Sequence, residues 1–129
     1  MSAQHTSGVR LDHTVVHASD RAASAAFLAR ILGLEVGHRM GPFLPILLGN
    51  GVTLDYYAFT DGPIQSQHYA FHVPGDAFDA MVARLEAEEI TYYGDPNHTR
   101  PYTVGRAMTW RNVYFLDPDG HNMEIMTDA

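Results

Sequence analysis

One pattern of secondary structure occurs twice along this chain, and that repeat constrains the fold more than any other feature. Each half opens with a short alternating stretch that begins with histidine, at residues 13–17 and 68–72. A helix-forming segment follows, and each half ends in a β-prone stretch that carries a carboxylate. With 129 residues the chain can bury one core but is too short for two independent domains of usual size. We therefore expect one α+β domain made of two tandem βαβββ modules, at about residues 9–59 and 67–127.

Turn and cap signals place the individual elements. The first module is expected to contain a strand, a helix and three more strands, at 9–18, 22–32, 35–40, 43–48 and 52–59. The second is expected to follow the same order, at 67–73, 76–88, 90–93, 112–116 and 122–127. Ser19 or Asp20 offers an N-cap for the first helix, and Gly33 would end it. The second module is longer, most naturally because of a loop at 94–110 that would form a lid.

Composition excludes several classes of protein. The chain has no cysteine, so any metal ion must be held by nitrogen and oxygen ligands. A formal net charge of −7 without a basic run argues against binding to nucleic acid. No stretch approaches the ~20 apolar residues of a membrane span, and residues 1–8 lack the apolar core of a signal peptide. We expect a cytoplasmic protein with neither nucleic acid nor a membrane as partner.

Two histidines and two carboxylates occupy corresponding positions in the two modules. His13 and His68 stand in the first strands, and Asp55 and Glu124 stand in the last strands. Strand parity places Asp55 and Glu124 opposite neighbours that would pack against a helix. A carboxylate within a mainly apolar strand is costly unless it is paired or metal-bound. Two imidazoles with one or two carboxylates suit a divalent iron, manganese, nickel, cobalt or zinc ion.

The alternative is that these groups are satisfied without a metal. The histidines would then be ordinary core side chains, and the carboxylates would form salt bridges with arginines, since the chain has no lysine; the candidates are Arg39, Arg106 and Arg111. His17 and His72 lie about 13 Å farther along their strands than His13 and His68, so they can line the same cavity but not bind the same ion.

These segments resemble the vicinal oxygen chelate superfamily, which contains glyoxalase I, the fosfomycin and bleomycin resistance proteins and the extradiol dioxygenases. The resemblance extends over residues 11–127 and rests on Leu-Asp-His-Thr at 11–14, the helix end at 31–34, His-Tyr-Ala-Phe at 68–71, and the segment 114–124. It implies that the sheets of the paired modules curl around a cavity. In that cavity a metal ion would hold two neighbouring oxygens of a small organic substrate.

The resemblance also assigns ligands. It implies that His13, His68 and Glu124 bind the divalent ion. Asp55 matches the fourth ligand of glyoxalase I, where a glutamate is usual, so the shorter side chain would reach the ion through water. Binding and resistance members often lack these ligands, and their presence here implies a metal-dependent enzyme.

Two branches of the superfamily imply different chemistry. In the isomerase or lyase branch, our first choice, Asp55 or Glu124 would act as the base. In the extradiol dioxygenase branch, Tyr114 would hydrogen-bond the substrate, because it stands ten residues before Glu124. That branch also uses a histidine acid/base, whose place is taken here by residues 108–110, and His17, His72, His98 and His121 are the available replacements. A metal-free binding or resistance protein is the alternative from another class.

The expected site needs both modules. In many relatives the modules that face each other come from different chains, so we expect a homodimer with two shared sites. The substrate would be a small oxygenated molecule enclosed by Tyr57, Trp110, Tyr114 and Met126.

Overall fold

A computed structural model describes residues 8–129 and confirms an α+β fold built from two modules. The first module consists of β1 (His13–Ala18), α2 (Arg21–Leu32), β2 (Phe43–Leu47) and β3 (Thr53–Ala58). The second consists of β4 (His68–His72), α3 (Gly75–Ala87), β5 (Gly105–Arg106), β6 (Trp110–Leu116) and β7 (Asn122–Asp128). The expectation for the polar N-terminal stretch falls almost entirely on residues 1–7, outside the described residues.

Each module has its own mixed sheet, and both sheets follow one plan. The strand order is β1-β3-β2 in the first sheet and β4-β7-β6-β5 in the second. The first and last strands of each module are parallel neighbours, so His13 pairs with Thr53 and His68 pairs with Asn122. The remaining pairs are antiparallel. The sheets are not closed into one barrel within the chain, and one face of each stays open.

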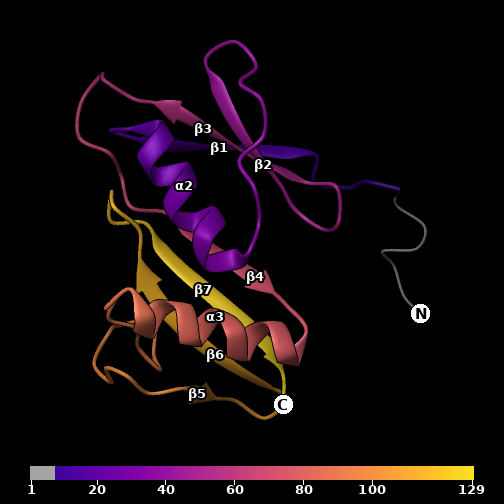
Figure 1. Cartoon of the computed structure of the whole chain (residues 1–129), viewed down its shortest axis with the longest axis vertical. Helices are drawn as coiled ribbons and strands as arrows, with labels where there is room; N and C mark the ends of the chain where they lie inside the picture. The colour runs from indigo at the N-terminus through magenta and orange to yellow at the C-terminus, as the bar shows by residue number, and fades with distance from the viewer. Residues whose placement is uncertain (1–7) are drawn as a thin grey trace.

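Both helices lie on the same side of the two sheets, α2 with the first module and α3 with the second (Figure 1). The carboxylate of Asp20 accepts a hydrogen bond from the backbone N–H of Ala23 at 3.1 Å and caps α2. Gly33 ends the helix with a φ of 69°, a left-handed conformation that glycine adopts without strain. Both caps agree with the sequence.

The core lies between these helices and the sheets. The strand side chains that form the core alternate with exposed ones, as expected, and Val16 and Ala18 of β1 are buried beneath α2. The periodic apolar residues of α3 are buried in the same way, at Phe78, Met81 and Leu85. The opposite face of each sheet therefore carries the odd-numbered residues of β1 and the even-numbered residues of β4, β6 and β7.

The strand expected at 35–40 does not form. Only Val36 and Met40 make isolated bridges to β2. Gly37 donates its N–H to the Pro45 carbonyl at 2.8 Å, but proline has no N–H to return, so the ladder is interrupted at the centre of β2.

The strand expected at 90–93 is also absent, although its residues favour β structure. Ile90 donates its N–H back to Leu85 at the end of α3, and only Tyr93 reaches β6. The edge position beside β6 is taken instead by β5, from the loop expected as a lid.

The two modules are tied together by the turn before β7. His121 is fully buried; its Nδ1 accepts a hydrogen bond from the Gln67 N–H at 3.0 Å, and its Nε2 donates to the His17 carbonyl at 2.8 Å. Asp119 accepts from the Ser19 N–H and the Ser24 hydroxyl of the first module. Within residues 8–129 no helix is long and apolar enough to cross a membrane.

Candidate metal centre

His68 and Glu124 form the central pair of the candidate site. They lie on the open face of adjacent parallel strands, and His68 Nε2 is 3.1 Å from Glu124 Oε1. The Glu124 residue is only 7% exposed, whereas the His68 side chain is about half exposed. A buried carboxylate thus faces a histidine that is open to solvent.

The hydrogen bonds of His68 define which of its ring nitrogens is available to bind a cation. Its Nδ1 lies 2.8 Å from the Asn122 carbonyl oxygen, which can only accept, so Nδ1 carries a proton. In the neutral ring Nε2 then has a lone pair directed at a carboxylate oxygen. Two acceptors at 3.1 Å repel each other unless a proton or a metal ion lies between them. The pair can therefore share either a proton, as a histidine–carboxylate ion pair, or a metal ion.

Asn112 and Tyr114, on the neighbouring strand β6, complete the surroundings of Glu124. Asn112 Nδ2 donates to Glu124 Oε2 at 2.9 Å and to the Tyr114 hydroxyl at 3.3 Å. Burial and the charge of Glu124 raise the pKa of Tyr114, so its phenol is protonated at neutral pH. The site thus contains a hydrogen-bond donor beside the carboxylate.

Gly105 of β5 pairs with Asn112 and leaves room for its side chain. A β-carbon at this position would lie 2.5 Å from Asn112 Oδ1 and would overlap the Gly94 carbonyl oxygen. Only glycine allows β5 to approach Asn112 this closely.

His13 and Asp55 form a second group, on the open face of the first module. Both line a cavity of about 390 Å³ together with Asp12, Glu35 and Thr53. His13 Nδ1 donates to the Asp12 carboxylate at 2.8 Å, and this bond, together with the charges of Asp12 and Asp55, raises the pKa of His13. The bond also leaves His13 Nε2 as the nitrogen that is free to bind a metal ion.

The expected metal ligands thus fall into two half-sites: His13 and Asp55 form one, and His68 and Glu124 form the other. Among residues 8–129 no three histidine or carboxylate side chains are grouped closely enough to hold an ion. Each half-site presents one imidazole Nε2 oriented through Nδ1 and at least one carboxylate, a donor set that fits a divalent ion such as iron, manganese, nickel, cobalt or zinc. No hydrogen bond or ion pair in the described part of the chain joins Asp55 or Glu124 to an arginine: Arg111 pairs with Asp79, and Arg39 with the Gly41 carbonyl.

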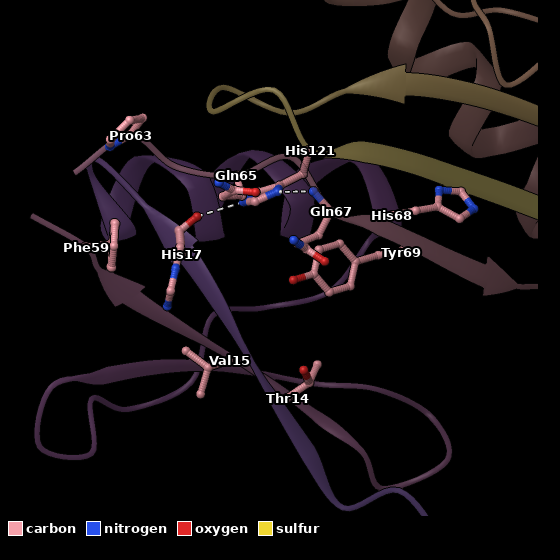
Figure 2. A pocket seen from close by; sticks show the side chains of 10 residues that line it. All are labelled: Thr14, Val15, His17, Phe59, Pro63, Gln65, Gln67, His68, Tyr69 and His121. Atoms are coloured by element: carbon pink, nitrogen blue, oxygen red, sulfur yellow. Dashed lines mark hydrogen bonds between the residues drawn. The ribbon is translucent and has the colours of Figure 1, made fainter. Parts of the chain in front are cut away.

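A cavity of about 420 Å³ extends from His68 along the junction of the modules. The His17 and Phe59 rings that line it are stacked, with centroids 4.3 Å apart. Figure 2 shows His121 between His17 and Gln67, with its hydrogen bonds to both. His121 is thus a link between the modules. His72 bonds Asp128 at 2.9 Å, and His98 lies in the loop beside Asn122.

Sequence reasoning overlooked Asn112. Strand parity contained the signal, because Asn112 stands two residues before Tyr114 and so shares its face. Without the register of β6 against β7, its contact with Glu124 was not predictable.

The family model of the glyoxalase/bleomycin resistance protein/dioxygenase superfamily matches residues 10–125, and the chain belongs to this superfamily. It is 49% identical to the solved structure named oxidase ChaP-H2, with a TM-score of 0.89 and coverage of 93% of this chain and 94% of that one. It is 44% identical to oxidase ChaP-H1, again with a TM-score of 0.89, over 93% and 96% of the two chains. It is also 29% identical over 120 residues to the glutathione transferase FosA of Serratia marcescens, covering 89% of this chain and 78% of that protein. These relatives carry the names of enzymes with different reactions.

Proposed function

We propose that this protein is a metal-dependent oxidase that oxidises a small substrate with two neighbouring oxygens, such as a catechol-like ring, with dioxygen as the electron acceptor. The observation that carries the proposal is the His68–Glu124 pair, in which an oriented imidazole nitrogen faces a buried carboxylate at 3.1 Å. Superfamily members generally use divalent metal ions, which agrees with this donor set.

The residues around the pair have separate roles in this proposal. His68, Glu124 and His13 would hold the ion, and Asp55 would hold it through water. A bound divalent ion supplies a Lewis acid for both substrate oxygens and, where it is redox-active, a path for electrons to dioxygen. Tyr114 donates a hydrogen bond to a substrate oxygen from its protonated phenol. Asn112 keeps Glu124 in place and offers no proton that is easily lost.

The similarity to two proteins named oxidases supports an oxidase over a lyase. The lyase branch was the one that the sequence alone favoured. Both are more than 40% identical to this chain over nearly all of it. The buried Tyr114 beside Glu124 adds independent support, since a lyase that uses carboxylates as bases has no need of this phenol.

We also propose that the working unit is a homodimer in which each ion is bound by two chains. His13 and Asp55 of one protomer would face His68 and Glu124 of its partner. Large apolar side chains remain exposed on the open sheet faces of both modules, at Val15, Leu47 and Trp110. A second copy of this chain would cover these side chains and complete the site.

Oxygen uptake tests the proposed reaction. The protein is reconstituted anaerobically with ferrous iron and mixed with a panel of catechols and larger polyhydroxylated aromatics in an oxygen electrode. We expect uptake that depends on both iron and substrate, and a product that has gained oxygen or lost hydrogen. Absence of uptake with every substrate, although iron is bound, would contradict the oxidase proposal.

A lyase or isomerase is the second candidate, because Asp55 offers a second carboxylate at the site. Nickel- or zinc-loaded protein would then convert the adduct of glutathione and methylglyoxal without consuming oxygen. Binding of an aromatic compound without any metal would instead favour the binding and resistance class.

A further inference from the structure

We infer that His98, in the loop 94–104, is a positioning residue that couples this loop to the metal ligand His68 through Asn122. The inference rests on the proposed function, because it takes His68 as a ligand of the ion. The loop otherwise lies outside both half-sites, and neither the family match nor the relatives' names give His98 a role.

The connection runs through hydrogen bonds that meet at Asn122, whose Nδ2 also donates to the Pro96 carbonyl of the loop at 3.4 Å. His98 Nε2 donates to the Asn122 side-chain carbonyl at 2.9 Å. The backbone carbonyl of the same asparagine accepts from His68 Nδ1 at 2.8 Å. Asn122 is also held by its N–H on the Gln67 carbonyl, at 2.8 Å. The side chain that accepts from His98 and the carbonyl that orients His68 thus belong to one residue, the first of β7.

The His98 ring is itself held firmly. It is stacked on Tyr93 with centroids 4.2 Å apart and an interplanar angle of 5°. Tyr93 in turn exchanges two backbone hydrogen bonds of 2.8 Å with Tyr114, a wall of the site. The ring thus sits between the loop and the sheet that carries Glu124.

The loop backbone presents His98 in an unusual conformation. His98 has a φ of 58°, in the left-handed region that non-glycine residues rarely occupy. The Asp95 carboxylate stabilises this turn by accepting hydrogen bonds from the Thr99 N–H, the Thr99 hydroxyl and the Arg100 N–H, at 2.7 to 3.1 Å. Such a conformation persists only where surrounding contacts determine it, and here they aim the ring at Asn122.

Partners that orient a metal-bound histidine typically change metal affinity by 10- to 100-fold when they are removed. His98 acts one residue farther out, so we expect the lower end of that range. Coupling is reciprocal: if the loop orients His68 for the ion, the bound ion must also stabilise the loop.

Metal titration of the intact protein tests the coupling, with cobalt(II) as probe and its absorption spectrum as readout. We expect His98→Ala and Asn122→Ala each to raise the dissociation constant about tenfold, and the double variant to be no worse than either single one. His98→Gln keeps an N–H donor near the position of Nε2 and should stay within about threefold of the wild-type chain. The exposed His38→Ala is the matched control.

Amide hydrogen exchange supplies a second readout. Cobalt should slow exchange in residues 94–104 of the wild-type chain and have no such effect in His98→Ala. Wild-type affinity in His98→Ala, losses that multiply in the double variant, or equal losses in His98→Gln and His98→Ala would each overturn the inference. His68→Ala, titrated in parallel, separates the two proposals: if it binds cobalt like the wild-type chain, the proposed metal site itself fails.

Discussion

At the scale of single residues, the central feature of this chain is a buried carboxylate that lies between a histidine and an asparagine amide, and the same amide also contacts a phenol. Glu124 has Asn112 on one oxygen and His68 on the other. No arginine of residues 8–129 forms an ion pair or hydrogen bond with Glu124, so in the metal-free chain these contacts compensate for the burial of the carboxylate.

Asn112→Ala tests this dependence. Without its donor, Glu124 is left with an unsatisfied buried oxygen, and the free energy of unfolding of the metal-free protein should fall by about 1–3 kcal/mol. Urea unfolding in the presence of a chelator measures the loss. The exposed Asn97→Ala should show no change, and an equal loss in both variants would mean that the Glu124 contact is not the cause.

Tyr114→Phe separates the two reaction branches. If the phenol donates a hydrogen bond to substrate during oxidation, its removal should lower turnover by a factor on the order of ten to a thousand with metal content unchanged. The exposed Tyr102→Phe serves as control. In the lyase alternative Tyr114→Phe would barely matter, while Asp55→Asn or Glu124→Gln would be severe even where metal is retained.

At the scale of elements, β5 is the segment whose position depends on one glycine. In Gly105→Ala the added methyl group would overlap the Gly94 carbonyl and push against Asn112, so β5 must move away from β6. We expect a loss of about 1–3 kcal/mol in unfolding free energy, as for other overpacked sites, together with weaker metal binding. Gly49→Ala has nothing within 4 Å of its new methyl group and should leave both quantities unchanged.

The turn between β6 and β7, which is hydrogen-bonded to Ser19 and Ser24 of the first module, gives a pH-dependent prediction. Burial opposes ionisation of Asp119, but hydrogen bonds from Ser19 and Ser24 outweigh it and lower the pKa of this carboxyl below its usual value. A lowered folded-state pKa stabilises the fold above the unfolded-state pKa of about 4, and this contribution is lost as the pH falls through the folded-state value. Asp119→Asn should therefore be less stable than the wild-type chain at pH 7, with the difference shrinking below about pH 4. A difference independent of pH would contradict this account.

Sequence patterns predicted most elements because the evidence for them is local. The caps of α2 and the alternation in β1 follow from side chains within a few residues of each other. The strands predicted at 35–40 and 90–93 were wrong, because whether these segments pair depends on residues outside them. Pro45 interrupts the first ladder, and the second segment folds back on α3. For the site, the faces of His13 and Glu124 followed from parity, whereas the hydrogen bonds of Asn112, Asn122 and His98 depend on the register between strands and loop.

At the scale of the whole molecule, the separation of the two half-sites is the central feature. The modules are fixed to each other through His121 and Asp119, and within residues 8–129 no three histidine or carboxylate side chains are grouped closely enough to hold an ion. The open sheet faces with their exposed apolar side chains offer the surface on which a second chain would complete each site.

Mixing two inactive variants tests this arrangement most directly. His13→Ala and Glu124→Ala homodimers should each bind no metal at full affinity, since each of their sites lacks a ligand. If every site combines the first module of one chain with the second module of its partner, a heterodimer of the two variants places both substitutions in one site and leaves the other intact. Metal analysis of the purified heterodimer should then give one tightly bound ion per dimer; a heterodimer without tightly bound metal would show that the sites do not form between chains.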